Sequence, residues 1–188
     1  MSKAKLIVIS APSGSGKTSV LKEILKLNKG KLTFSISATT RKKRHNEING
    51  VEYYFLTEEK FKQKLEKNDF VEWENIYGDY YGTLKSEVDR LLQEDKSILF
   101  ELDVNGSLQL KKLYPEAKLI FIVPPSIEVL EERLKNRNTE TPEKLAKRIE
   151  RAKMELDKAK YFDFEVKNYE LADAVTEVNK IVQELLTN

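Results

Sequence analysis

Short apolar runs alternate with helical stripes over most of the chain. The runs at 5–9 and 117–123 are nearly continuous and end at proline-containing segments, which predicts buried strands. In other segments apolar residues recur every three or four positions, as from Val20 through Ile24 to Leu27, and we expect each such stripe to face the core. Strands that alternate with helices predict an α/β fold with a parallel sheet covered on both faces. The expected strands are residues 5–9, 32–37, 97–103, 117–123 and 163–166, and the expected helices are residues 17–27, 85–93, 106–113, 127–137, 143–160 and 171–185.

The pattern changes between residues 35 and 87. A polar, basic segment at 39–50 predicts a loop, and an aromatic-rich strand at 51–56 follows it. A short helix at 58–67 precedes two short strands, 70–74 and 79–82, around a turn at Gly78. We therefore expect residues 35–87 to form a small mixed lobe inserted into the main sheet.

Composition narrows the class of protein. The 188 residues, 40% of them hydrophobic and 34% charged, suit one globular domain under a charged surface. A net charge of +2 does not indicate a nucleic-acid binder. Cysteine is absent, which excludes disulfides and thiolate metal sites. No run approaches the roughly 18 apolar residues of a membrane span, and the first apolar run is too short for a signal peptide, so we expect a soluble, cytoplasmic protein.

A glycine-rich loop joins the first predicted strand to the first predicted helix. Gly14 and Gly16 allow the backbone to wrap around an anion, and the helix that follows adds the positive end of its dipole. Lys17 supplies a cation for the β- and γ-phosphates, and Thr18 offers a hydroxyl to Mg²⁺. The loop matches G-x-x-x-x-G-K-[ST] except at Ala11, and the alternative is a turn without a ligand. The phosphate loop comprises Ala11, Pro12, Ser13, Gly14, Ser15, Gly16, Lys17 and Thr18.

Polar residues at other strand ends should meet this loop. Ser37, Glu101 and Asp103 end predicted strands, and ligands of parallel sheets bind at the carboxyl ends of the strands. Glu101 and Asp103 are two positions apart and project to the same face. Acids beside a phosphate loop typically help to hold Mg²⁺ or its waters, and the alternative is a pair of solvated acids.

The run from Arg41 to Arg44 is the densest basic segment, because all four of its residues are lysine or arginine. It suits a phosphate clamp, a solvated surface or a nucleic-acid patch. Tyr53 and Tyr81 have hydroxyls that could join a clamp. His45 is the only histidine, and no catalytic or metal-binding set can be assembled around it.

Two further features allow two interpretations each. Glu72 has apolar neighbours, which predict that it is partly shielded from water, and by itself it is an ordinary carboxylate. Arg133, Arg137, Arg148 and Arg151 surround a Thr/Glu/Pro break between two predicted helices. They form either a salt-bridged helix surface or a mobile lid that neutralises a transferring phosphoryl group.

Taken together, these motifs resemble those of the guanylate kinase family over nearly the whole chain. The spacing from Thr39 to Leu56 follows the family signature without a break, whereas Asn105 stands where the family often has glutamine. The matching residues are the phosphate loop at 10–18; Thr39, Thr40, Arg41, Arg44, Glu47, Gly50, Tyr53, Phe55 and Leu56; Val71, Glu72 and Trp73; Tyr80, Tyr81 and Gly82; Glu101, Leu102 and Asp103; Arg133, Leu134 and Arg137; Lys147 and Arg148; and Asn168.

The resemblance implies a P-loop NTPase-type parallel sheet with an inserted GMP-binding lobe and a helical lid, and transfer of the ATP γ-phosphate to GMP with Mg²⁺. The division would be core 1–34, 88–126 and 158–188, lobe 35–87 and lid 127–157. dGMP is a second candidate acceptor. Ser37, Glu72, Thr83 and Asp103 would contact guanine. The GMP phosphate would be held by Arg41, Arg44, Tyr53 and Tyr81. The ATP phosphates and the transferring group would face Lys17, Arg44, Arg133, Arg137 and Arg148, with Thr18 and Glu101 at Mg²⁺ and Asn168 near adenine.

Three rivals remain at this point. Catalytically inactive relatives bind phosphorylated peptides, but Lys17 and the lid arginines argue against that role. A kinase for another phosphorylated small molecule would not need Glu72 and Asp103. Nucleic-acid binding through the basic run would show a steep salt dependence.

Overall fold

A five-stranded sheet forms the centre of the protein, in the strand order β2-β7-β1-β8-β9. The structure is a computed structural model that describes residues 4–136 and 142–187. Every neighbouring pair of strands in this sheet is parallel. The predicted α/β fold with a parallel sheet is therefore confirmed. The strands are β1 (Leu6–Ser10), β2 (Leu32–Phe34), β7 (Ser97–Glu101), β8 (Lys118–Val123) and β9 (Phe164–Lys167).

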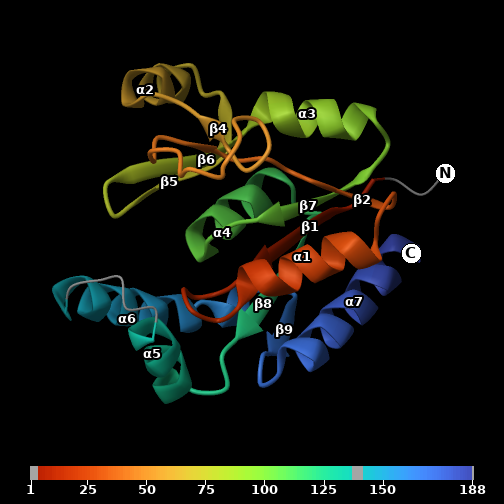
Figure 1. Cartoon of the computed structure of the whole chain (residues 1–188). Helices are drawn as coiled ribbons and strands as arrows, with labels where there is room; N and C mark the ends of the chain where they lie inside the picture. The colour runs from red at the N-terminus through yellow and green to blue at the C-terminus, as the bar shows by residue number, and fades with distance from the viewer. Residues whose placement is uncertain (1–3, 137–141, 188) are drawn as a thin grey trace.

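Helices cover both faces of the sheet (Figure 1). Alternate side chains of β1 point to opposite faces, so Ile7 and Ile9 join one apolar cluster and Leu6 and Val8 join the other. The helices α1 (Lys17–Leu27) and α7 (Leu171–Thr187) close the first cluster. The helices α3 (Lys85–Gln93) and α4 (Val104–Leu113) close the second cluster. In Figure 1, α4 lies between the sheet and the lobe above it, and α3 lies beside the lobe.

The inserted segment forms a second sheet of four strands in the order β4-β3-β6-β5, with one helix packed on it. It has a small core of its own, in which the rings of Phe61 and Phe70 stack with centroids 4.3 Å apart. The hairpin between its last two strands turns at Tyr77 and Gly78, both of which have positive φ. The elements are β3 (Ala38–Thr39), β4 (Tyr54–Phe55), α2 (Glu58–Glu66), β5 (Phe70–Ile76) and β6 (Asp79–Leu84).

Two helices on the other side of the phosphate loop form a second appendage. The helices α5 (Ile127–Lys135) and α6 (Pro142–Leu156) pack on each other through Leu130, Leu134 and Ala152. In Figure 1 the lobe lies above the loop between β1 and α1, and the α5–α6 pair lies below it. The 3₁₀ turn η1 (Ala159–Tyr161) then leads to β9.

Some predicted boundaries and one predicted orientation are wrong. The strands expected at 32–37 and 51–56 shrink to β2 and β4, and the long helix ends at Leu156 instead of residue 160. Leu27, expected to face the core, is 56% exposed. Its place is taken by Asn28, which is buried and whose amide Nδ2 donates hydrogen bonds to the Ile24 carbonyl and to Asn179 of α7. A polar residue with satisfied hydrogen bonds thus ends the apolar stripe.

None of the helices in residues 4–136 and 142–187 combines the length and the apolarity that crossing a membrane requires.

We expect Phe61→Ala to open the lobe selectively. Removing a fully buried ring from so small a core should lower the local opening free energy by roughly 3–5 kcal/mol. Native-state hydrogen exchange should then show faster exchange of amides in α2, β5 and β6, while β1 and β8 keep their protection. Leu27→Ala, at an exposed leucine, is the control and should change exchange little. Equal loss of protection in both sheets would mean that they unfold as one unit.

Candidate functional site

The phosphate loop leaves the carboxyl end of β1 and enters α1 with the geometry of an anion site. Gly14 and Gly16 have φ of 92° and 86°, in the left-handed region that favours glycine. A Cβ on Gly16 would also lie 2.5 Å from the Asn168 amide nitrogen. Both the backbone conformation and the close side chain therefore disfavour a larger residue at position 16. No described side chain caps the start of α1, which leaves its first N–H groups available to a ligand.

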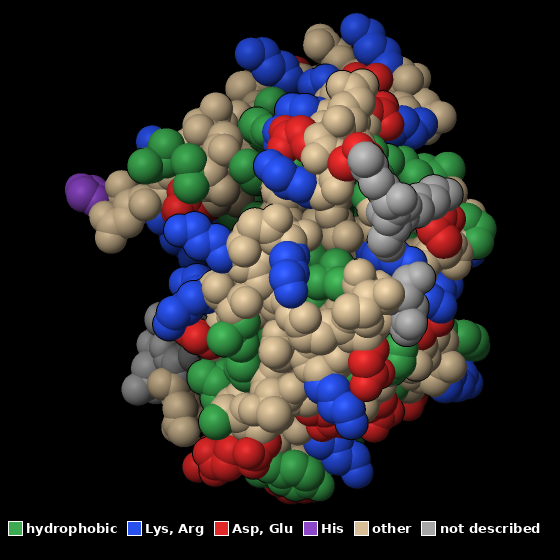
Figure 2. Space-filling view, turned by 90° about the vertical axis from the view of Figure 1, so that its right-hand side faces the viewer, with side chains coloured by type: hydrophobic (Ala, Val, Ile, Leu, Met, Phe, Trp, Pro, Cys, Tyr) green, Lys and Arg blue, Asp and Glu red, His purple; other side chains and the backbone are tan. Residues whose placement is uncertain are grey.

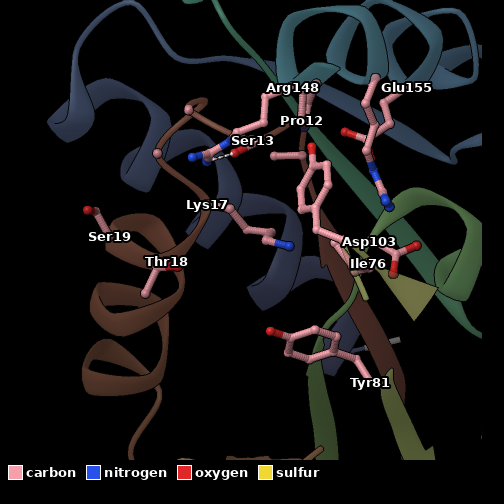
Figure 3. Close-up of a pocket in the computed structure, with 15 residues that line it drawn as sticks. Pro12, Ser13, Lys17, Thr18, Ser19, Ile76, Tyr81, Asp103, Arg148 and Glu155 are labelled. Atoms are coloured by element: carbon pink, nitrogen blue, oxygen red, sulfur yellow. Dashed lines mark hydrogen bonds and ion pairs between the residues drawn. The ribbon is translucent and has the colours of Figure 1, made fainter. Parts of the chain in front are cut away.

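Three side-chain hydrogen bonds join this loop to distant parts of the chain. The Lys17 ammonium donates a hydrogen bond to the Leu102 carbonyl at 3.1 Å, and Asn168 Nδ2 donates to the Ser15 carbonyl at 2.7 Å. From α6, the Arg148 guanidinium donates to the Ser13 hydroxyl (Figure 3). The loop is therefore held by residues just after β9 and β7 and by α6.

Thr18 and Glu101 form a pair of oxygen donors beside the loop. The Thr18 hydroxyl donates to Glu101 Oε1 at 2.8 Å. Hydroxyl and carboxylate oxygens are ligands that Mg²⁺ accepts, so the pair fits the ion. Within the described ranges, no group of three or more His, Cys, Asp or Glu side chains could hold a metal. An ion here would need phosphate oxygens and waters to complete its shell.

The loop borders a cavity of about 340 Å³ (Figure 3). Lys17 points into it from α1, and Tyr81 and Asp103 face it from the opposite side. Both appendages contribute to its walls, the β5–β6 hairpin with Ile76, Tyr77 and Tyr81, and α6 with Arg148, Arg151 and Glu155. The cavity thus lies where the main sheet, the lobe and α6 meet.

A second, basic cavity of about 520 Å³ lies under the lobe, and its walls include Ser37, Arg41, Arg44, Tyr53 and Tyr81. Thr18 and Tyr81 line both cavities, so the two are neighbours. Burial, reinforced by the charge of Glu101, raises the pKa of Tyr53 to about 12. Its hydroxyl therefore keeps its proton and can donate to an anion.

Glu47, which matches the family signature but had no role assigned from the sequence, holds the arginine of this cavity in place. The Arg41 guanidinium donates to both oxygens of Glu47, at 2.7 and 3.1 Å, and its carbon lies 5.4 Å from the centre of the Tyr53 ring. Glu47 also accepts a hydrogen bond from the Arg44 backbone N–H at 2.7 Å. The bonds from Arg41 and from the Arg44 backbone lower the pKa of Glu47 to about 2. The paired hydrogen bonds to Glu47 fix the orientation of the Arg41 guanidinium, and some of its five N–H donors remain available to a ligand.

A buried carboxylate lies at the contact between the lobe and α4. Glu72 is 4% exposed, and its Oε1 accepts a hydrogen bond of 2.7 Å from the Thr83 hydroxyl. Its Oε2 lies so close to α4 that a Cβ on Gly106 would be 2.5 Å away. Asp103 caps the start of α4 by accepting a hydrogen bond from the Gly106 N–H at 2.9 Å. The sequence therefore predicted correctly that Glu72 is shielded.

Burial controls the charge of this carboxylate. It raises the pKa of Glu72 to about 7; the Thr83 hydrogen bond opposes the shift, and the charges of Asp103 and Glu74 add to it. Glu74 belongs to no motif of the sequence and lies two positions along β5 from Glu72. Its pKa is also raised to about 7, mainly by burial and then by Asp103.

The remaining predicted residues lie apart from the central cavity. Arg133 lies on the other side of the loop, where its guanidinium approaches the Asn168 carbonyl at 3.4 Å. It lines a cavity of about 430 Å³ together with Asn168 and Tyr169. Arg137 lies outside the described residues.

Comparisons with known proteins agree on one family. The family model described as guanylate kinase matches residues 3–185. Guanylate kinase of Porphyromonas gingivalis is 46% identical over 184 residues, which cover 97% of this chain and 98% of that protein. Guanylate kinase of Clostridium tetani is 44% identical over 182 residues, covering 97% and 86%. The crystal structure of guanylate kinase from Anaplasma phagocytophilum matches with a TM-score of 0.80 at 23% identity, over 100% of this chain and 89% of that one, and supports the fold. The resemblance drawn from the sequence motifs is confirmed.

We expect Glu72 to make the protein less stable as pH rises from 4.5 to 7. The folded state retains a proton in this range that the unfolded chain, with its ordinary carboxyl pKa of 4.5, has already lost. The free energy of unfolding should fall through this window by on the order of 3 kcal/mol for this group and then level off. Urea unfolding at a series of pH values should show a smaller decline for Glu72→Gln. The control Glu23→Gln, at an exposed carboxyl on α1, should retain the wild-type decline.

Proposed function

The chain belongs to the guanylate kinase family, which catalyses ATP-dependent phosphorylation of GMP to GDP, and we propose that its two neighbouring cavities bind the two nucleotides. ATP phosphates occupy the cavity at the phosphate loop, and the GMP phosphate occupies the basic cavity under the lobe. One observation carries this assignment: Thr18 and Tyr81 line both cavities. An oxygen of the GMP phosphate thereby faces the γ-phosphorus. In-line transfer forms the bond between these two atoms while the bond from the γ-phosphorus to the β–γ bridging oxygen breaks, and that oxygen leaves as part of ADP.

Arg41, Arg44, Tyr53 and Tyr81 bind the acceptor phosphate in this proposal. The Glu47 fork leaves one face of Arg41 for the ligand, and the Tyr53 hydroxyl donates. Arginine suits this task because its planar donors match phosphate oxygens.

Glu72 selects guanine. Guanine presents adjacent N1–H and N2–H₂ donors, and a carboxylate has two acceptor oxygens to meet them. Adenine lacks that donor pair and would leave a buried carboxylate unpaired, which costs binding free energy. Thr83 already orients Oε1, and Ser37 and Asp103 complete the base site. These contacts involve base and phosphate but no ribose 2′-hydroxyl, so the proposal extends to dGMP.

The donor half uses the loop and the lid. Lys17 exchanges the Leu102 carbonyl for the β- and γ-phosphates, whose charge outcompetes a neutral acceptor. Arg148, already at Ser13, neutralises the transferring group, with Arg133 and Arg137 as further cations. We place the adenine in the cavity beside Arg133 and Tyr169. Asn168 lines the same cavity, and its amide holds the loop through the Ser15 carbonyl.

Thr18 and Glu101 hold Mg²⁺, partly through water. When bound, the ion neutralises charge on the β- and γ-phosphates.

Residues 35–87 act as the GMP-binding lobe, 127–157 as the lid, and the remainder as the core, with closure that excludes water from the phosphates. A cytoplasmic location suits a chain with no cysteine and ATP as donor.

The distribution of charge on the surface does not support nucleic-acid binding through the basic run. On the face shown in Figure 2, lysine and arginine side chains are interspersed with acids and form no continuous basic area. Arg41, the first cation of the run, is turned toward Glu47.

An acceptor panel tests the proposal. With ATP and Mg²⁺, the protein should release ADP with GMP and dGMP but hardly with AMP, CMP or UMP. Glu72→Gln should lower kcat/KM for GMP roughly 10- to 100-fold, because an amide cannot accept both guanine donors, and should leave KM for ATP unchanged. Glu94→Gln, at a surface acid on the far end of α3, is the control. Turnover with AMP or UMP but not GMP would contradict the assignment.

Lys17→Ala should abolish measurable turnover while the fold stays intact, because the ammonium is the mobile cation of the donor site. Coupled ADP release and far-ultraviolet circular dichroism measure the two properties. Lys26→Ala removes a cation from the same helix at a side chain that is 77% exposed and should keep wild-type rates. Wild-type activity in Lys17→Ala would refute the role of the loop.

A further inference from the structure

The helix α6 reaches the lobe through Arg151. Its Nη2 lies 3.0 Å from Glu74 Oε1 on β5, and its Nε lies 2.7 Å from Glu155 Oε1 one turn along α6. The guanidinium carbon is also 5.9 Å from the centre of the Tyr77 ring in the β5–β6 hairpin. The side chains of Arg151 and Glu74 are only 20% and 18% exposed. Shielding from water makes this pair stronger than an ordinary surface ion pair.

Glu74 is placed to transmit this contact to the base site. It lies on the same face of β5 as Glu72, and its Oε1 also accepts a 3.0 Å hydrogen bond from Asn105 at the start of α4. Asn105 in turn accepts a hydrogen bond from Lys158, just beyond α6. The other oxygen, Oε2, is buried and receives no hydrogen bond from the described residues. Removing Arg151 would therefore leave a poorly compensated carboxylate beside the guanine pocket.

We propose that Arg151 and Glu74 form a latch that holds the lid helix against the strand carrying Glu72 and thereby couples guanine binding to lid closure. This inference rests on the proposed function, because it concerns how the acceptor site is completed. Both are positioning residues, since their contacts are with protein groups.

The spacing on α6 explains why the latch matters for transfer. Arg148 contacts the phosphate loop, and Arg151, three positions later, contacts the lobe. Residues three apart lie on one side of a helix, so one rigid element touches the donor and acceptor halves together. Without the latch, more molecules have the lid helix away from the lobe, and the apparent affinity for GMP falls by the same fraction.

Not every ion pair of α6 does this. Lys153 pairs with Glu131 of α5 at 3.4 Å, with side chains 51% and 29% exposed. That pair joins two helices of the lid and does not reach the lobe, so Lys153 is a matched control on the same helix.

A double-mutant cycle on the whole chain tests the latch. We expect Arg151→Gln and Glu74→Gln each to raise KM for GMP roughly five- to tenfold, with kcat changed less than threefold because saturating GMP drives closure. The double variant should be no worse than the poorer single variant, since both substitutions break one contact. Arg151→Lys, which keeps the charge but not the fork, should recover part of the affinity. Lys153→Gln should match wild type.

A purely structural role predicts a different result. It would lower the thermal unfolding midpoint and the amount of active enzyme, and hence kcat, at constant KM for GMP. KM within twofold of wild type in both single variants, or additive effects in the double variant, would overturn the latch. The proposed function fails separately, by absence of GMP phosphorylation in the wild-type protein.

Discussion

The pairing of β1 with β7 is the constraint on which the site depends. Their register sets Ile9 opposite Glu101, so the phosphate loop begins beside the acid that ends β7. Thr18 and Glu101, 83 positions apart, can therefore share a hydrogen bond. Parallel neighbours need a long crossover connection, and here the connection contains α1, β2, the lobe and α3. The same pairing thus places the lobe over the edge where the loop ends.

Charge is segregated along the crevice. Lys17, Arg148 and Arg41 lie toward the proposed phosphate positions, and each is held by a protein acceptor: the Leu102 carbonyl, the Ser13 hydroxyl and the Glu47 carboxylate. These partners fix the cations in advance, which reduces the ordering that a ligand must impose. Acids gather at the other end, around the start of α4. A nucleoside monophosphate has the matching arrangement, with an anion at one end and base N–H donors at the other.

Local signals were enough to predict the phosphate loop, the alternation of strands and helices, and the shielding of Glu72. Each depends on neighbours in the chain: glycines at positive φ, an apolar run, or apolar residues beside an acid. Prediction failed where a contact with a residue distant in the sequence decides the orientation of a side chain. Leu27 continued a helical stripe, but Asn28 takes the inward position because Asn179 lies opposite it. The hydrogen bond from the Asn168 amide to the Ser15 carbonyl joins residues 153 positions apart, and no local pattern predicts it.

The sequence by itself therefore determined the fold class, the family and the conformation of the glycine-rich loop, because each depends on short patterns whose spacing is set by backbone geometry. Only the tertiary structure decided which charges meet. Glu74 and Arg151 are 77 positions apart and carry no motif, yet the packing of α6 against the lobe brings them to 3.0 Å. Electrostatic energy depends on separation and burial in space, which only the assembled fold defines.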